Sequence, residues 1–358
     1  MTYNFLQHYW SFIGALFCAL LVLLLFVQGV NAMVHSLCYT EKSRQVIYDS
    51  TKCKWALTTT TLIVLCGLFF AAFPKFYSAS FCGAYWLWAI SLSTFVLQAI
   101  GYMLMDRVKN PGVFRFFLTL NGYLGPMLIG CVMATLFEGA DFIFDKEGAP
   151  ITNASHGLDA LANPLVLIFS VSVFFLARLL GVLYLRKSIT DEDILSTSYG
   201  RLIAATIHFV VLFMIFFVHL LLFKDGYAYD DGGLITIEPN KYLTNFLDMW
   251  YLALILLIGM VLVVFSALKS IFHKTYTGGF WPAAIGAGLI TMALMLSAMW
   301  NHTAYYPSTT AMQSSLTIAN SCNSEATLRT MFYASLLIPV AIAYAVYRWR
   351  AADRKEAA

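Results

Sequence analysis

The sequence has few charged residues for its length. Asp, Glu, Lys and Arg make up only 11% of its 358 residues, whereas 60% are hydrophobic, and this balance excludes a water-soluble globular chain. The net charge of +3 is too small to indicate a nucleic-acid partner. We therefore expect a membrane protein that binds no nucleic acid.

Catalytic and metal-binding motifs are absent as well. The sequence contains no P-loop, no dinucleotide-binding glycine motif before a strand, no H-E-x-x-H and no nucleophile elbow. Its seven cysteines are scattered, without a C-x-x-C pair or a Cys-His group at ligand spacing, which indicates apolar fillers. We expect no catalytic residue, metal site or cofactor in this chain alone.

The sequence does contain nine apolar stretches, most of them near the ~20 residues that a membrane-spanning helix needs. They cover residues 9–33, 55–73, 81–105, 115–137, 162–186, 202–223, 244–269, 280–300 and 329–349. Barrel strands would be shorter and alternating, so we predict an all-α integral membrane protein. Short connections favour two four-helix bundles plus one peripheral helix in a single polytopic domain, residues 1–358, with halves at 1–140 and 160–350. The first stretch lacks a basic leader and a cleavage site, so we expect it to be retained.

Lysine and arginine gather on one side of these spans. With the N-terminus outside, sixteen of the 22 cations are cytoplasmic: Lys42, Arg44, Lys52, Lys54, Arg107, Lys109, Arg115, Arg186, Lys187, Arg201, Lys269, Lys274, Arg348, Arg350, Arg354 and Lys355. Five lie on the other side: Lys75, Lys146, Lys224, Lys241 and Arg329. Because cytoplasmic loops retain Lys and Arg, we expect a periplasmic N-terminus and a cytoplasmic C-terminus in a bacterial cytoplasmic (inner) membrane.

A few polar groups lie inside the predicted spans. Arg178 is the intramembrane charge, and it indicates either an anion, substrate or partner contact or an intramembrane pair that clamps helices. His208 and His219 share one helix face but lie roughly 16 Å apart, so one metal cannot bind both, and we favour hydrogen-bonded polar histidines over haem ligands. Asp248 is expected to be an interfacial carboxylate at a helix N-terminus.

Two local features concern the helices themselves. The run from Thr58 to Thr61 opens the second span, and its hydroxyls are expected to bond back to carbonyls of their own helix rather than line a polar path. Pro126, with Gly122, Gly125 and Gly130, indicates a kinked and closely packed fourth span. The loop of residues 301–328 is expected to be ordered over the mouth of the bundle.

Two segments resemble subunit II of the cytochrome bd quinol oxidases. The first runs from Leu68 through Phe73 and Pro74 to Tyr77, Phe81, Gly83 and Tyr85, and is similar to the family's L-F-A-A-[WF]-P-x-x-Y-x-x-x-F-x-G-[FY] segment. The second contains Pro307, Ser308, Ser315, Leu316, Thr317, Asn320, Ser324 and Met331, and resembles the family's loop before the final helix. Gly101, Pro126, Gly130 and Gly139 also stand where the family has the same residues.

The resemblance implies a non-haem subunit in an oxygen-reducing complex. In this family the partner subunit I carries haems b558, b595 and d and oxidises the quinol, which is the substrate of the complex. Subunit II stabilises subunit I, holds a structural quinone or lipid in some members, and contributes to a proton path from the cytoplasm. Small single-span subunits and membrane lipids are further partners to expect, in aerobic or microaerobic respiration.

The sequence departs from the family where that proton path begins. The family's D-G-F-D-M-G-V-G run reads from Gln28 to His35 here, which keeps Gly29 but replaces both carboxylates with the amides of Gln28 and Asn31. The family's W-D-G-N-Q-V-W run keeps only Trp55, and its Arg-Pro pair before Gly101 reads Gln98-Ala99. Amides can position water but do not titrate. The path is therefore rebuilt as a polar path from Gln28, Asn31, His35, Trp55, Thr58 and Thr59, or it is lost to subunit I.

Two other functions fit a nine-helix chain. A secondary transporter of a small solute could use Arg178 as an anion contact, but the paired Gly or Pro breaks of such transporters are not evident. A structural assembly factor would differ by not remaining stoichiometrically bound to a haem protein. We predict the oxidase subunit, which is part of an enzyme and holds no catalytic centre of its own.

Overall fold

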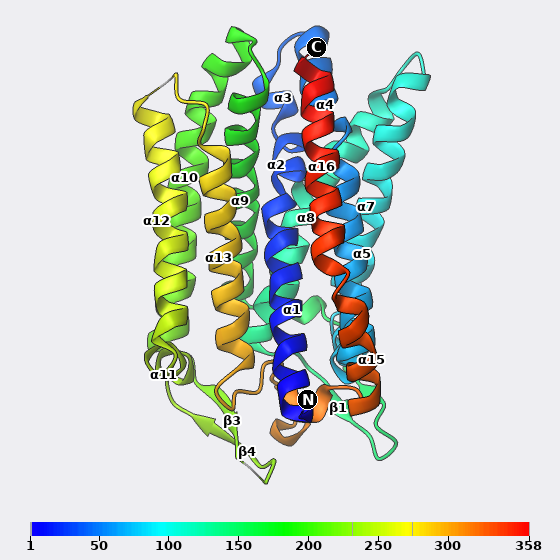
Figure 1. Cartoon of the computed structure of the whole chain (residues 1–358), viewed down its shortest axis with the longest axis vertical. Coiled ribbons are helices and arrows are strands. Elements are labelled where there is room, and N and C mark those ends of the chain that lie inside the picture. Colours follow the sequence, from blue (N-terminus) through cyan, green and yellow to red (C-terminus); the bar gives the residue numbers. More distant parts are fainter. Residues whose placement is uncertain (1, 231, 274, 358) are drawn as a thin grey trace.

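Long helices run side by side between the two ends of the molecule, and the chain termini lie at opposite ends (Figure 1). This computed structural model describes residues 2–230, 232–273 and 275–357, except for the side chains of residue 348 and of residues 351–357. Within those residues nine helices are long and apolar enough to cross a membrane, which confirms the nine predicted spans and the all-α class. Of the predicted cytoplasmic cations, Lys274 and the side chains of Arg348, Arg354 and Lys355 lie outside the described part.

The elements follow one another as a series of long helices with short ones between them. The spans are α1 (Tyr3–Leu24) with α2 (Phe26–Asn31), α5 (Trp55–Ala72), α7 (Tyr85–Leu104), α8 (Gly112–Glu138), α9 (Pro164–Ser188), α10 (Glu192–Leu222), α12 (Trp250–Phe272), α13 (Phe280–Met299), and α15 (Glu325–Ser335) with α16 (Ile338–Ala357). The shorter helices are α3 (Val34–Leu37), α4 (Glu41–Lys52), α6 (Pro74–Gly83), α11 (Lys241–Asp248) and α14 (Ile318–Ser321). Two antiparallel hairpins, β1 (Ile143–Phe144) with β2 (Pro150–Ile151) and β3 (Gly226–Tyr229) with β4 (Ile235–Glu238), were not predicted.

Several helices begin where the sequence supplies an N-cap. The side chain of Thr40 accepts the amide of Ser43 at the start of α4, and the carboxylate of Asp191 accepts two amides at the start of α10. Asn163 caps α9 and is followed by Pro164, whose missing amide hydrogen is no loss at a first helical position. These caps help to set where the membrane-spanning helices begin.

The centre of the bundle is held by close backbone crossings of α2 against α8 and α9. A Cβ on Gly29 would lie 1.9 Å from the carbonyl oxygen of Ala177 in α9, and one on Gly122 of α8 would lie 2.5 Å from the amide nitrogen of Ala32. Only glycine permits such approaches. The predicted close packing around Gly122 is therefore present.

The two sequence segments that carry the family resemblance meet at the end of the bundle where the N-terminus lies. Phe73 is the C-cap residue of α5, and its ring lies 6.2 Å from the ring of Tyr305. The backbone amide of Asn323 donates to the backbone carbonyl of Ala72. In the same loop the amide of Ser308 donates to the hydroxyl of Ser315 at 2.9 Å. The predicted order of residues 301–328 follows from these contacts.

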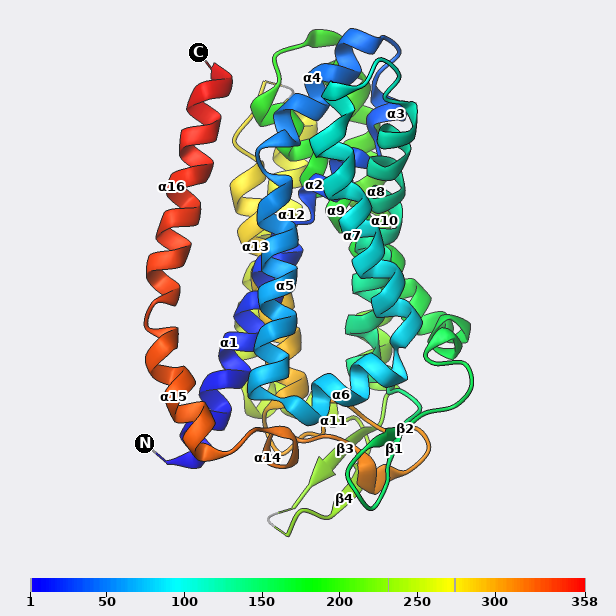
Figure 2. The same cartoon turned by 90° about the vertical axis from the view of Figure 1, so that its right-hand side faces the viewer.

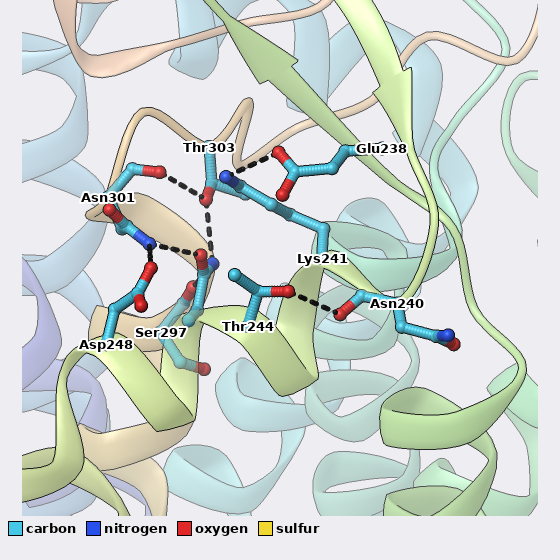
Figure 3. Close-up of polar contacts among 9 residues, drawn as sticks. Glu238, Asn240, Lys241, Thr244, Asp248, Ser297, Asn301 and Thr303 are labelled. Atoms are coloured by element: carbon cyan, nitrogen blue, oxygen red, sulfur yellow. Dashed lines mark hydrogen bonds and ion pairs between the residues drawn. The ribbon is translucent and has the colours of Figure 1, made fainter.

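A second set of polar contacts fastens the outer hairpin β3–β4 and the helix α11 to the end of α13 (Figure 3). The amide of Asn245 donates to the carbonyl of Ser297 at 2.8 Å and to the hydroxyl of Thr303 at 2.7 Å. The amide of Asn301 donates to Asp248 at 3.0 Å, just before α12 begins. Asp248 is the last residue of α11, two residues before α12, so it does not lie in the first turn of a helix as expected.

The last span stands apart from the rest. Figure 2 shows α15 and α16 on one flank, and only 6% of the span Glu325–Tyr347 is buried, against 28–78% for the other spans. The predicted single helix of residues 329–349 is broken, because α15 ends at Ser335 and α16 begins at Ile338, next to Pro339. This is the predicted peripheral helix, whereas the division into halves at 1–140 and 160–350 stays a prediction.

Candidate functional site

Four buried amide side chains lie together at the crossing of α2, α7 and α8. They are Gln28, Asn31, Gln98 and Asn121, each with 0% exposure, and we call them the amide cluster. The side-chain Nε2 of Gln28 donates to Oε1 of Gln98 at 2.9 Å. The side-chain Nδ2 of Asn121 donates to the hydroxyl of Thr94 at 3.2 Å. The cluster is a polar centre within an otherwise apolar bundle.

The amide cluster keeps hydrogen-bonding capacity that the described residues do not use. Gln28 Oε1, Asn31 Nδ2, Gln98 Nε2 and Asn121 Oδ1 are buried without a partner in the described part of the chain. Each such atom costs about 1–3 kcal/mol when it lacks a partner altogether. A cluster of this kind therefore suits polar groups from outside the chain, and water is the ordinary one.

Tyr102 of α7 connects the amide cluster to the end of the bundle where α4 lies. Its hydroxyl donates to Oδ1 of the Asn31 side chain at 2.7 Å and lies 2.8 Å from the hydroxyl of Thr51 in α4. The ring of Trp55 stacks on the ring of Tyr102 with centroids 6.0 Å apart. A continuous hydrogen-bonded link thus runs from α4 to the interior.

Charged groups surround the point where that link leaves the interior. Lys52 of α4 pairs with Asp106, and the hydrogen bond from Lys52 lowers the pKa of the Asp106 carboxyl. Lys54 is fully buried, and its ammonium donates to the carbonyl of Ser50 at 3.2 Å. The α4 end of the link is therefore flanked by an ion pair and a buried lysine.

The structure unites some of the predicted polar-path residues and separates others. Gln28 and Asn31 belong to the amide cluster, and Trp55 stacks on Tyr102, which links the cluster to α4. The side chain of His35 is exposed, outside the cluster. Thr58 donates to the carbonyl of Leu24 across helices at 3.1 Å, whereas Thr59 bonds back to Trp55 in its own helix as expected.

Residues that the sequence analysis did not assign complete the cluster. Asn121 and Tyr102 were not singled out, and Gln98 was noted only as a departure from the family. The available signal was the same for Gln98 and Asn121, because each is an amide within a long apolar stretch.

The remaining residues shared with the family pack helices together or lie at the ends of helices and in the loop of residues 301–328. A Cβ on Gly101 of α7 would lie 2.7 Å from Leu118 of α8, and Pro126 lies inside α8. Gly83 ends α6, which begins at Pro74 directly after α5. The carbonyl of Pro307 accepts the amide of Ala140 at 3.0 Å.

The described residues form no cluster of metal-ligating side chains. In the part of the chain that the structure covers, no three His, Cys, Asp or Glu side chains gather as metal ligands would. His208 Nδ1 lies 2.6 Å from the carbonyl of Ala204, and its exposed ring stacks on Phe175. His208 is thus a histidine that contacts its own helix and a neighbouring ring, as the sequence analysis favoured.

Comparison with known proteins gives one consistent result. A family model described as cytochrome bd terminal oxidase subunit II matches residues 6–352. The cytochrome bd-I ubiquinol oxidase subunit 2 of Escherichia coli (strain K12) is 22% identical over 354 residues, which cover 95% of this chain and 92% of that protein. The probable cytochrome oxidase subunit 2 of Haemophilus influenzae is 23% identical, with 98% of this chain and 94% of that protein covered. The fold is similar to that of a chain in the structure of bd oxidase from Geobacillus thermodenitrificans, with a TM-score of 0.59, 12% identity and 98% of each chain covered.

Proposed function

The chain belongs to the cytochrome bd terminal oxidase subunit II family, and from this membership we propose what it does for the complex it joins. It is subunit II of a quinol oxidase, and it works in a complex with another subunit, subunit I. The family implies that the haems lie in that partner. The comparisons give no support to the transporter alternative.

We propose that this chain is the non-haem scaffold on which subunit I folds and retains its haems b558, b595 and d. The observation that carries the proposal is the exposure of the last span, of which only 6% is buried. A helix that contributes so little to its own bundle contributes to something else, and the partner subunit is the large apolar body that the family supplies.

The docking surface is an apolar groove between the last span and the bundle, with a volume of about 760 Å³. Its walls come from α1, α5 and α16, including Leu20, Leu57, Val64, Leu337 and Ala341. We call it the α16 groove. Large apolar side chains such as Val340 and Tyr344 of α16 are also more than half exposed.

The α16 groove is held open by contacts at its two ends. At the outer end the hydroxyls of Tyr9 and Ser335 lie 2.7 Å apart, and the rings of Tyr9 and Phe332 are 4.8 Å apart. At the other end the ring of Trp349 lies 5.4 Å from that of Phe26. These two anchors leave the middle of α16 for a transmembrane segment of subunit I.

We propose further that the amide cluster is the inner part of a proton path from the cytoplasm. The Thr51–Tyr102–Asn31 link gives it a hydroxyl connection to α4, and its spare donors and acceptors would orient water. His35, Thr58 and Thr59 play no part in this version of the path. Protons would move along water and hydroxyl groups, because no amide titrates.

The location follows from the same proposal. The cation-rich connections, such as α4 and the turn between α9 and α10, lie at the end where the chain terminates (Figure 1), which supports a cytoplasmic C-terminus and a periplasmic N-terminus in the bacterial inner membrane. Small single-span subunits, a structural quinone and membrane lipids are further partners under this proposal, and quinol is the substrate of the complex.

The scaffold proposal has a direct optical test. The tagged chain, purified in mild detergent from its native membrane, should carry b- and d-type haem bands in a dithionite-reduced minus oxidised spectrum, together with a stoichiometric larger partner. The chain expressed alone should be colourless. A colourless preparation without a partner from the native membrane would refute the proposal.

Variants of the hydrogen-bonded pair Gln28 and Gln98 can distinguish a structural role of the amide cluster from a role in carrying protons. Gln28→Leu alone leaves the Gln98 amide buried without its partner, which should cost about 1–3 kcal/mol, whereas Gln28→Leu with Gln98→Leu should be nearly neutral for stability. If the cluster carries protons, both variants should lower oxygen consumption about tenfold or more, the effect of ~1.4 kcal/mol on the limiting step. Full oxygen consumption and membrane potential in the stable double variant would leave the cluster a purely structural role.

A further inference from the structure

Two arginines lie at the same height on neighbouring helices, away from the amide cluster. Arg178 is ten residues before the end of α9 and Arg201 is nine residues after the start of the antiparallel α10. At 1.5 Å per residue both stand about 15 Å from the cytoplasmic ends of their helices. The ring of His208 stacks on the ring of Phe175, three residues before Arg178, and Arg201 lies two helical turns before His208 on the same face of α10. Arg201 is therefore turned toward Arg178.

Neither arginine has a counter-charge among the side chains that the structure describes. Among the residues that the structure describes, no Asp or Glu forms an ion pair with Arg178 or Arg201, and Arg178 Nε is buried without a partner. A guanidinium stays protonated under all ordinary conditions, so two like charges side by side favour an anion between them. The predicted clamp by an intramembrane ion pair is thus not formed within the described chain.

Aromatic rings hold Arg178 in place. Its guanidinium lies 5.4 Å from the centroid of the Phe174 ring and 5.9 Å from that of Phe175. Tyr123 stacks on Phe174, and His208 stacks on Phe175. The rings orient the cation, but they supply no negative charge.

This surface faces lipid rather than the proposed partner. Ile207 and Val211 of α10, in the turns that follow Arg201, are 56% and 51% exposed, and Tyr123 is 42% exposed. In Figure 2, α8 and α10 lie on the flank opposite α16. The arginine pair therefore stands on the opposite side of the bundle from the α16 groove.

We propose that Arg178 and Arg201 together bind the phosphate of an anionic phospholipid from the cytoplasmic leaflet. Guanidinium groups match a phosphate with two parallel hydrogen bonds. Basic sites between membrane helices on the cytoplasmic side recognise such headgroups. The acyl chains would lie along Ile207 and Val211.

The test is native mass spectrometry of the complete oxidase complex after delipidation. The complex is titrated with phosphatidylglycerol, with phosphatidylcholine, or with inorganic phosphate in competition. Arg178→Gln and Arg201→Gln should each weaken phosphatidylglycerol binding roughly fivefold, and the double variant about 25-fold, with phosphatidylcholine unaffected. Lys269→Gln is the matched control, because Lys269 is another cation near the cytoplasmic end of a span, held over the rings of Phe265 and Tyr276, and should leave binding unchanged.

Two outcomes would overturn the proposal. Unchanged phosphatidylglycerol binding in the double variant would exclude these arginines as the site, and displacement of the lipid by millimolar inorganic phosphate would assign the site to a free anion. Arg178→Lys keeps the charge and removes the two-pronged geometry, so it should bind with intermediate affinity. This variant tests the proposal even where a glutamine variant fails to assemble, and the haem content of each preparation reports assembly separately.

Discussion

Gly29→Ala should destabilise the chain by about 3 kcal/mol or more, because the added methyl carbon has no space at the crossing of α2 and α9. Its Cβ would lie 1.9 Å from the Ala177 carbonyl oxygen and 2.3 Å from the carbonyl carbon, and both atoms belong to the helix backbone. A side chain could turn away, but a backbone carbonyl cannot move without displacing α9. We expect a lower apparent melting temperature of the purified complex and a lower yield of haem-loaded complex.

Gly200→Ala is the matched control for this result. Gly200 lies inside α10, and a Cβ there would meet nothing within 4 Å. Alanine favours a helix over glycine by about 1 kcal/mol, so the control should melt at the same or a slightly higher temperature. If Gly29→Ala melted like the control, α2 and α9 would have to lie farther apart than they do here.

The spans were predictable because length and hydropathy decide them. A stretch of ~20 apolar residues has few alternatives to a membrane helix, and all nine stretches became helices. The break before Ile338 follows from Pro339, which hydropathy does not register. The two hairpins depend on local contacts instead. Such contacts leave no periodic signal in a single sequence.

The amide cluster was predictable only in part. Gln28, Asn31 and His35 are spaced by three and four residues, which would place them on one face of a continuous helix. The helix ends at Asn31, however, and α3 begins at Val34, so His35 turns outward. That break cannot be read from hydropathy, because the residues around it are apolar.

The partners of the cluster come from elsewhere in the chain. Gln98 and Asn121 meet Gln28 and Asn31 only because α7 and α8 pack beside α2, and that packing depends on Gly122 and Gly101. A single sequence states which spans contain an amide, but it does not state which amides meet. The threonine run shows the same limit, since Thr58 satisfies the carbonyl of Leu24, at the break between α1 and α2.

Filling the α16 groove should prevent subunit I from docking. Ala341 and Ala345 line the groove on the side of α16 that faces α1 and α5. Ala341→Phe with Ala345→Phe would occupy the space that we assign to a segment of the partner. The ratio of haem to tagged chain, measured from the optical spectrum, should fall about tenfold or more, which corresponds to ~1.4 kcal/mol or more of lost docking energy.

Ala343→Phe separates docking in the groove from docking elsewhere on α16. Ala343 is exposed but does not line the groove, so the same added ring on this residue should leave the haem ratio unchanged. Loss of haem in Ala343→Phe alone would move the partner to the outer face of α16 and leave the groove to lipid.

Because α16 is anchored at Trp349 and through α15 at Tyr9, neither variant should release the helix from the bundle, and the amount of chain in the membrane should stay the same. Loss of haem without loss of chain is therefore the result expected of a docking surface and not of a misfolded subunit.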